Sequence, residues 1–160
     1  MSAGTQSNLV NRLVIAIREE VATQRRILEL LNAQEGSIRQ PAGPAFKTAT
    51  EELEVQLKRS SQRTARRERA VVALAEEFGV APSAATVGSL VERLGVDGEL
   101  LAVERAHLVE VSGEIGRLNR RMATLVRLHR QVTRELIQVV LGPEDGGDVH
   151  AGGSLIDAEV

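Results

Sequence analysis

The longest hydrophobic pattern in the chain lies in residues 97–141. Apolar side chains recur there every seven residues, and a second series follows the first three residues later. The two series occupy twelve positions, ten of them apolar: Leu101, Glu104, Leu108, Val111, Ile115, Leu118, Met122, Leu125, His129, Val132, Leu136 and Val139. A repeat of this length predicts one long helix with a narrow apolar stripe that faces other helices. Asp97 is a suitable N-cap, and Gly142 followed by Pro143 is a suitable end, so the helix is predicted from Asp97 to Leu141.

Two further long helices are predicted upstream. In residues 5–33, apolar side chains recur in steps of four and three, and Gln24 is the polar exception in this series. Residues 45–78 show a similar series, apolar at both ends and polar in the middle. The intervening residues 36–44 contain two glycines and two prolines, which predict a loop that lets the chain reverse direction.

A short helix is predicted in residues 87–94, between Thr86 as N-cap and Gly95 as C-terminal stop. Long helices joined by short connections most simply pack antiparallel to their neighbours. The sequence therefore predicts an all-α fold, an antiparallel up-down-up bundle of three long coiled-coil-like helices with one short connecting helix. Gly113 and Gly116 interrupt the last helix and predict a soft joint within it.

Composition supports a helical bundle. The chain has no Trp, Tyr or Cys and two Phe, while 42% of its residues are hydrophobic. Aliphatic side chains of this kind suit helix seams, and the absence of Cys excludes disulfides and thiolate metal sites. Apolar runs are too short to cross a bilayer, and the N-terminus lacks the pattern of a secretion signal, so a soluble cytoplasmic protein without membrane insertion is expected.

Charge separates the end of the chain from the rest. Residues 143–160 carry five acidic side chains and no Lys or Arg, so the preceding residues hold 20 basic against 17 acidic side chains. We therefore predict a helical bundle domain in residues 1–142 and an acidic, Gly-rich, disordered tail in residues 143–160. The final segment, residues 154–160, has apolar anchors that would suit docking on a partner or on the last helix, or it is part of a solubilising tail.

Candidate chemistry is scarce. His107, His129 and His150 have no second ligand at metal-binding spacing, and no nucleophile or phosphate-loop motif is present. His129 interrupts the apolar seam, where a hydrogen-bonded core or boundary histidine is the expected interpretation. Adjacent carboxylates such as Glu19 and Glu20 point about 100° apart on a helix and are expected to be solvated. We expect no enzyme, no metal and no cofactor.

Basic residues gather on two helices. One group lies in the second helix (Lys58, Arg59, Arg63, Arg66, Arg67 and Arg69), and another recurs every seven residues in the last helix (Arg120, Arg127 and Arg134). A solvated bundle exterior is the expected role. Nucleic-acid binding is not expected, because acidic residues are interleaved and no Tyr or Trp is present to stack on bases.

An apolar surplus marks the end of the last helix. Apolar residues there fill more than one stripe: Leu125, Val126, Leu128, Val132, Leu136, Ile137, Val139 and Val140. Two interpretations remain open. Either this segment packs against two neighbouring helices, or it offers a face to the helix of a partner protein.

Several segments resemble the FlgN family of flagellar type III export chaperones. These are LELLNAQEG at the end of the first helix, EEFGV at the end of the second, TVGSLVERLG in the short helix, and IGRLNRRMATLVRLHRQVTRELIQVVLG in the last. The family pattern Leu-Asn-x-x-Asn-x-x-Leu is matched by Leu118, Asn119 and Leu125, with Met122 in place of the second Asn. The resemblance covers roughly residues 9 to 142.

The resemblance implies a cytoplasmic chaperone that keeps hook-filament junction proteins export-competent and brings them to the export apparatus. In the family, client binding is attributed to the C-terminal helical region. The expected partner-binding residues are therefore Leu125, Val126, Leu128, Val132, Leu136, Val139 and Val140, and the client would present an amphipathic terminal helix. The alternative is a helical scaffold or dimerisation module that uses the same face on a second copy.

Overall fold

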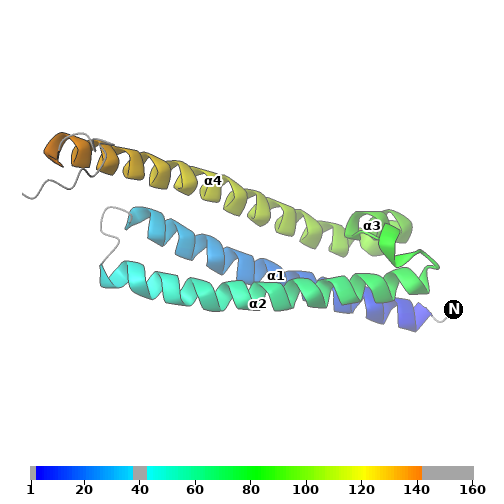
Figure 1. The fold of residues 1–160 in the computed structure, drawn as a ribbon. Helices are drawn as coiled ribbons and strands as arrows, with labels where there is room; N and C mark the ends of the chain where they lie inside the picture. Colours follow the sequence, from blue (N-terminus) through cyan, green and yellow to red (C-terminus); the bar gives the residue numbers. More distant parts are fainter. Residues whose placement is uncertain (1–2, 38–42, 142–160) are drawn as a thin grey trace, which may run out of the picture. The chain divides into compact units, whose positions relative to one another are not determined.

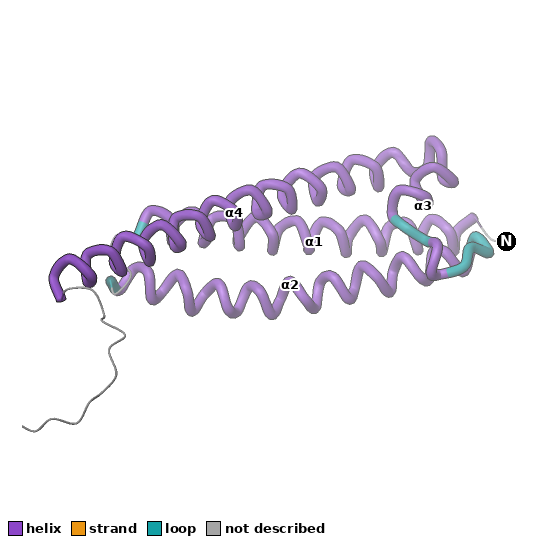
Figure 2. The backbone as a smooth tube through the Cα atoms, turned by 45° about the horizontal axis from the view of Figure 1, so that its top comes forward, coloured by secondary structure: helices purple, strands orange, loops and turns teal. Residues whose placement is uncertain are grey.

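The structure is a computed structural model that describes residues 3–37 and 43–141. Its elements are α1 (Ala3–Gly36), α2 (Pro44–Glu77), α3 (Val87–Leu94) and α4 (Glu99–Leu141), with short 3₁₀ helices at Pro82–Ala84 and Gly95–Gly98. All regular structure in these two ranges is helical (Figure 1, Figure 2). The predicted all-α class is thus confirmed, and the predicted helices match the observed ones to within a few residues.

The chain divides into two compact units, residues 1–122 and residues 123–160. Helix α4 is continuous across the boundary. The predicted tail in residues 143–160, including its final segment, lies outside the described residues. The domain boundary expected after residue 142 therefore stays a prediction.

Helices α1 and α2 run side by side in opposite directions (Figure 1). Two contacts fix this direction, since Glu20 near the middle of α1 pairs with Arg67, and Gln34 near the end of α1 donates to Thr50. The helices pair through many residues because α1 buries an apolar stripe with a helical period. This antiparallel pair is the scaffold of the first unit.

The first part of α4, residues 99–122, runs parallel to α1. Arg18 donates to Glu104 over 2.6 Å, and Glu35 further along α1 accepts from Arg121 further along α4. Increasing residue numbers in both helices therefore point the same way. Up to Met122, the three long helices follow the predicted up-down-up order.

Two apolar clusters form the core of the first unit. The larger one joins all four helices through Leu13, Val14, Ile17, Val21, Val71, Leu74, Ala75, Leu90, Leu94 and Leu101. The smaller one joins α1 and α4 through Ile27, Leu31 and Leu118. Between them, the middle of α2 contributes polar side chains, as its sequence pattern predicts. Apolar contacts therefore hold the helices together at both ends of the bundle, and polar contacts join them in the middle.

The segment between α2 and α4 folds as its capping residues predict, except at Asp97. Thr86 and Ser89 form a reciprocal capping box at the start of α3, and Gly95 adopts a φ of +57°, a conformation that glycine adopts readily. The prediction of Asp97 as N-cap of the last helix is wrong. Asp97 lies inside the 3₁₀ helix Gly95–Gly98, because the turn after Gly95 continues as one helical turn before α4 begins at Glu99.

Candidate functional site

The candidate site is the apolar face of α4 within residues 123–139. Each partner residue predicted there is exposed: Leu125 by 36%, Val126 by 41%, Leu128 by 55%, Val132 by 44%, Leu136 by 59% and Val139 by 82%. Ile137 is also exposed, by 51%. The side chain of Val140 lies outside the described residues, so its predicted role is untested.

Helical geometry gathers most of these side chains on one side. Leu125, Leu128, Val132, Leu136 and Val139 follow each other in steps of three, four, four and three, which places them within an arc of about 80° at 100° per residue. Val126 and Ile137 lie about 120° and 140° from the centre of this arc, outside the stripe. Because α4 is one uninterrupted α-helix through Leu141, these side chains keep this angular arrangement along it. The sequence therefore presents an aliphatic stripe more than four turns long.

The opposite side of the same segment is polar. Arg127, Arg130 and Arg134 lie there, and all three are exposed. On the flank, Gln131 donates to Glu135 over 2.9 Å. The segment is thus amphipathic, with an aliphatic face and a cationic face.

The exposure of these residues corrects part of the seam prediction. Heptad positions are buried or half-buried from Leu101 to Met122, but Leu125, Val132, Leu136 and Val139 are exposed. His129 is exposed as well, so the expected core or boundary histidine is wrong. The reason is that a heptad repeat specifies a stripe and leaves open whether a second helix covers it.

The predicted solvated role of Glu19, Glu20 and the α2 basic cluster is also partly wrong. Glu20 is 3% exposed and accepts from Thr64 over 2.8 Å and from Arg67 over 2.7 Å. Glu19 pairs with both Arg63 and Arg66. Buried carboxylates need such partners, so these residues link α1 to α2.

A second ionic contact links α1 to α4. Glu104 is 8% exposed, accepts from Arg18, and lies 3.5 Å from His107. The hydrogen bond from Arg18 lowers the pKa of Glu104 below its ordinary value, and His107 lowers this pKa further. Likewise, the hydrogen bonds from Arg121 lower the pKa of Glu35. These ion pairs give a structural role to polar residues of the α4 seam such as Glu104.

Neither a metal centre nor a membrane span is found in the part of the chain that the structure describes. In residues 3–37 and 43–141, no three His, Asp or Glu side chains are placed to share a metal ion. Within the same ranges, no helix combines the length and the apolar content needed to cross a bilayer.

Sequence reasoning missed one convergence of side chains. Arg12 of α1 lies with Arg66 and Arg69 of α2 around a cavity of about 270 Å³. Arg12 precedes Arg66 by 54 residues in the sequence, and no local pattern links the two. The antiparallel pairing of α1 and α2 brings them together.

The family model described as FlgN protein matches residues 1–148. No curated protein and no solved structure matches the chain.

Proposed function

Because the chain belongs to the FlgN family of flagellar export chaperones, we propose that it binds hook-filament junction proteins and keeps them competent for export. The family is a chaperone family, and binding without catalysis is sufficient for this role. We place the protein in the cytoplasm, where such clients are held before they reach the export apparatus. Residues 1–142 would form the helical body, and residues 143–160 a separate acidic segment.

The observation that carries the proposal is the exposure of the aliphatic stripe on α4. Leu128, Val132 and Leu136 are each at least 44% exposed, although side chains of this kind are usually buried. Covering apolar surface contributes roughly 25 cal/mol for each Å² removed from water. A partner that covered the stripe would therefore gain binding energy mainly from these residues.

The expected client segment is an amphipathic helix. Spacing in steps of three and four lets a second helix insert its own apolar side chains between those of α4. The cationic face with Arg127, Arg130 and Arg134 would remain in water and would favour clients with acidic flanks. A client helix covered in this way could not polymerise through the same apolar side chains.

The alternative is self-association through the same stripe. A second copy would present the same aliphatic side chains, and a long stripe suits a two-stranded coiled coil. The two functions differ in stoichiometry. A chaperone forms a complex with its client, whereas a scaffold dimerises without one.

The test is a double variant, Leu128→Asp with Val132→Asp. We expect loss of client binding in co-purification and calorimetry with a hook-filament junction protein, because two carboxylates would have to be desolvated at the contact. Circular dichroism should show the helicity of the parent protein, since both positions are exposed. Light scattering with and without client measures stoichiometry.

The matched control is Val103→Asp with Val109→Asp. These valines are exposed by 50% and 59%, but they lie in the first unit. Client binding should survive in this control. Equal loss of binding in both double variants, or dimerisation abolished with client binding intact, would contradict the proposed chaperone face.

A further inference from the structure

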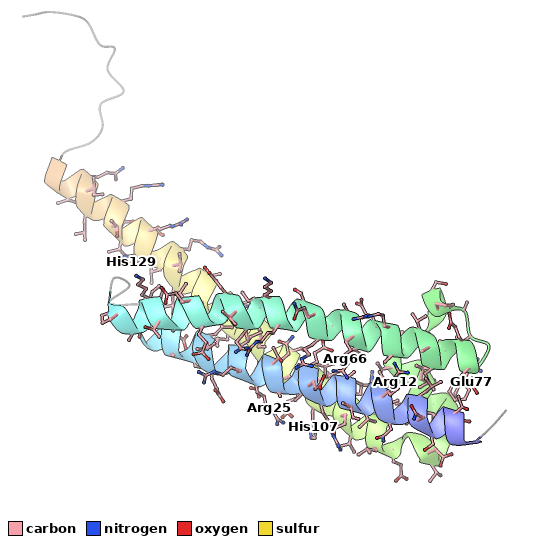
Figure 3. All side chains as sticks on the ribbon, turned by 90° about the horizontal axis from the view of Figure 1, so that it is seen from below. Arg12, Arg25, Arg66, Glu77, His107 and His129 are labelled. Atoms are coloured by element: carbon pink, nitrogen blue, oxygen red, sulfur yellow. The ribbon has the colours of Figure 1, made fainter. Side chains whose placement is uncertain are left out.

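A cationic cavity lies on the α1–α2 pair, within the first unit. It has a volume of about 270 Å³ and is lined by Arg12 and Ala16 of α1 and by Arg66, Arg69 and Ala70 of α2. Figure 3 shows Arg12 and Arg66 on the two neighbouring helices. The two alanines leave room between the helices, and the three arginines border that room.

Positive charge exceeds negative charge around this cavity. The nearest carboxylate that pairs with a lining residue is Glu19, which accepts from Arg66 and is shared with Arg63. Arg12 and Arg69 have no carboxylate partner within residues 3–37 and 43–141, and the Arg69 Nε donates instead to the backbone oxygen of Ala65. Two guanidinium groups therefore border the cavity without a counter-charge from the described chain.

The arrangement differs from the rest of the helix pair. Further along, Arg67 is matched by Glu20, and Arg26 is matched by both Glu29 and Glu52. Cations on neighbouring helices repel each other unless an anion lies between them. At the cavity, the described residues of α1 and α2 supply such a partner to Arg66 but not to Arg12 or Arg69.

Guanidinium groups select carboxylates and phosphates, because their planar donors match two acceptor oxygens. A cavity of this volume lies just below the usual range for small-molecule sites and admits one or two side chains. The chain has no Trp or Tyr, so stacking of a nucleobase is not supported. Carboxylates of a peptide fit both the charge and the size.

We propose that Arg12, Arg66 and Arg69 form a binding site for an acidic peptide segment. Glu or Asp side chains of that segment would enter between Ala16 and Ala70 and accept hydrogen bonds from the guanidinium groups. The segment belongs to a partner protein, whose carboxylates supply the counter-charge that Arg12 and Arg69 lack. Residues 143–160 of this chain, which carry five acidic residues and no basic ones, are the competing occupant that the test distinguishes. This site does not depend on the proposed client face.

The experiment uses the full chain with a neutralised end, so that its own acidic residues do not compete. The five substitutions are Glu144→Gln, Asp145→Asn, Asp148→Asn, Asp157→Asn and Glu159→Gln. The probe is a short, fluorescently labelled poly-glutamate peptide, measured by anisotropy at several salt concentrations. We expect binding that weakens as salt rises, and no binding of the equivalent poly-glutamine peptide.

The decisive variant adds Arg12→Gln and Arg69→Gln. Kd for the poly-glutamate peptide should rise about tenfold for each guanidinium removed. The matched control adds Lys58→Gln and Arg59→Gln, which changes the net charge equally on exposed residues of α2 that do not line the cavity. This control should leave Kd within about twofold. Equal weakening of peptide binding in both variants would mean that binding depends only on net charge, and it would overturn the site. A lack of poly-glutamate binding by the parent chain would overturn it as well.

Two further measurements complete the test. Thermal unfolding should be nearly unchanged in Arg12→Gln with Arg69→Gln, because neither side chain pairs with a described carboxylate; a large decrease would overturn the binding role in favour of a structural one. Comparison with the natural acidic end assigns the source. Equal poly-glutamate binding by the natural chain supports a partner's segment as the occupant, and weaker binding would overturn that assignment in favour of residues 143–160.

Discussion

Helix α4 carries one heptad repeat through two different surroundings. In residues 99–122, Leu101 is fully buried and Leu118 is 4% exposed. In residues 123–139, Leu125 is 36% exposed and Leu136 is 59% exposed at positions of the same repeat. Both parts have the same helical geometry and similar aliphatic side chains. The difference lies in burial: Leu118 of the first part packs with Ile27 and Leu31 of α1, whereas the side chains of the second part are exposed.

The comparison supports the proposal that one sequence pattern serves folding in the first part of α4 and recognition in the second. The first part stabilises the bundle because its leucines join apolar clusters with α1, α2 and α3. The second part contributes little burial of its own, so its apolar side chains cost little to replace in stability. Their exposure on one face supports the proposed binding role.

The most direct test of this difference is to place the same charged side chain in each part of α4 and to compare the loss of stability. Leu118→Asp should lower the free energy of unfolding by several kcal/mol, because a carboxylate would be buried among Ile27 and Leu31. Leu128→Asp should change it by no more than about 0.5 kcal/mol, because the side chain is 55% exposed. Urea unfolding followed by circular dichroism measures both. Similar losses in the two variants would mean that the second part is also core.

A smaller effect is expected from the two glycines in the first part of α4. A Cβ at Gly113 would lie 3.5 Å from the Arg117 Nη1, and one at Gly116 would lie 3.7 Å from the Arg120 Nη1. Both neighbours are ends of flexible side chains, so Gly113→Ala with Gly116→Ala should raise the free energy of unfolding by up to about 2 kcal/mol. Thermal and urea unfolding measure the gain.

Gly98 provides the contrasting case for the glycine pair. A Cβ there would lie 2.9 Å from the Leu94 Cβ and 3.0 Å from the backbone oxygen of Val91. Gly98→Ala should therefore be destabilising, since the turn before α4 has no space for a methyl group. A loss of stability in the Gly113 and Gly116 variant would show that the first part of α4 packs more tightly than its contacts indicate.

The smallest effect concerns acid sensitivity of the first part. The hydrogen bond from Arg18, with a further contribution from His107, lowers the pKa of Glu104 from its ordinary value of 4.5. The ionised form is favoured in the folded state, so its stabilisation is present above about pH 4.5 and is lost as the pH falls through the lowered pKa. Glu104→Gln should cost about 1 kcal/mol at neutral pH and progressively less in acid.

Urea unfolding at neutral pH and in acid measures this difference. Glu135→Gln in the exposed part of α4 is the matched control, because Glu135 accepts only a local hydrogen bond from Gln131 among the contacts that the described residues show. Its stability should stay close to that of the parent protein at each pH. A constant loss for Glu104→Gln across the pH range would contradict ionic stabilisation by Arg18.

The sequence by itself determined the helices, because local chemistry sets their lengths and ends. The heptad series predicted α4 to Leu141, the glycines and prolines of residues 36–44 predicted a reversal, and Thr86 with Gly95 bounded α3. It also indicated the apolar surplus from Leu125 onward. These features depend on residues within a turn or two of each other, and short-range patterns are what a single sequence carries most directly.

Only the tertiary structure decided which side chains meet across helices. Glu20 and Arg67 are 47 residues apart, and nothing in either neighbourhood distinguishes their buried contact from a solvated charge. In the same way, Arg12 reaches the cavity beside Arg66 through the antiparallel pairing of α1 and α2. Burial along α4 likewise changes after Met122 although the repeat does not. Burial, ion pairing and cavities depend on which helix lies opposite, and that relation exists only in the folded chain.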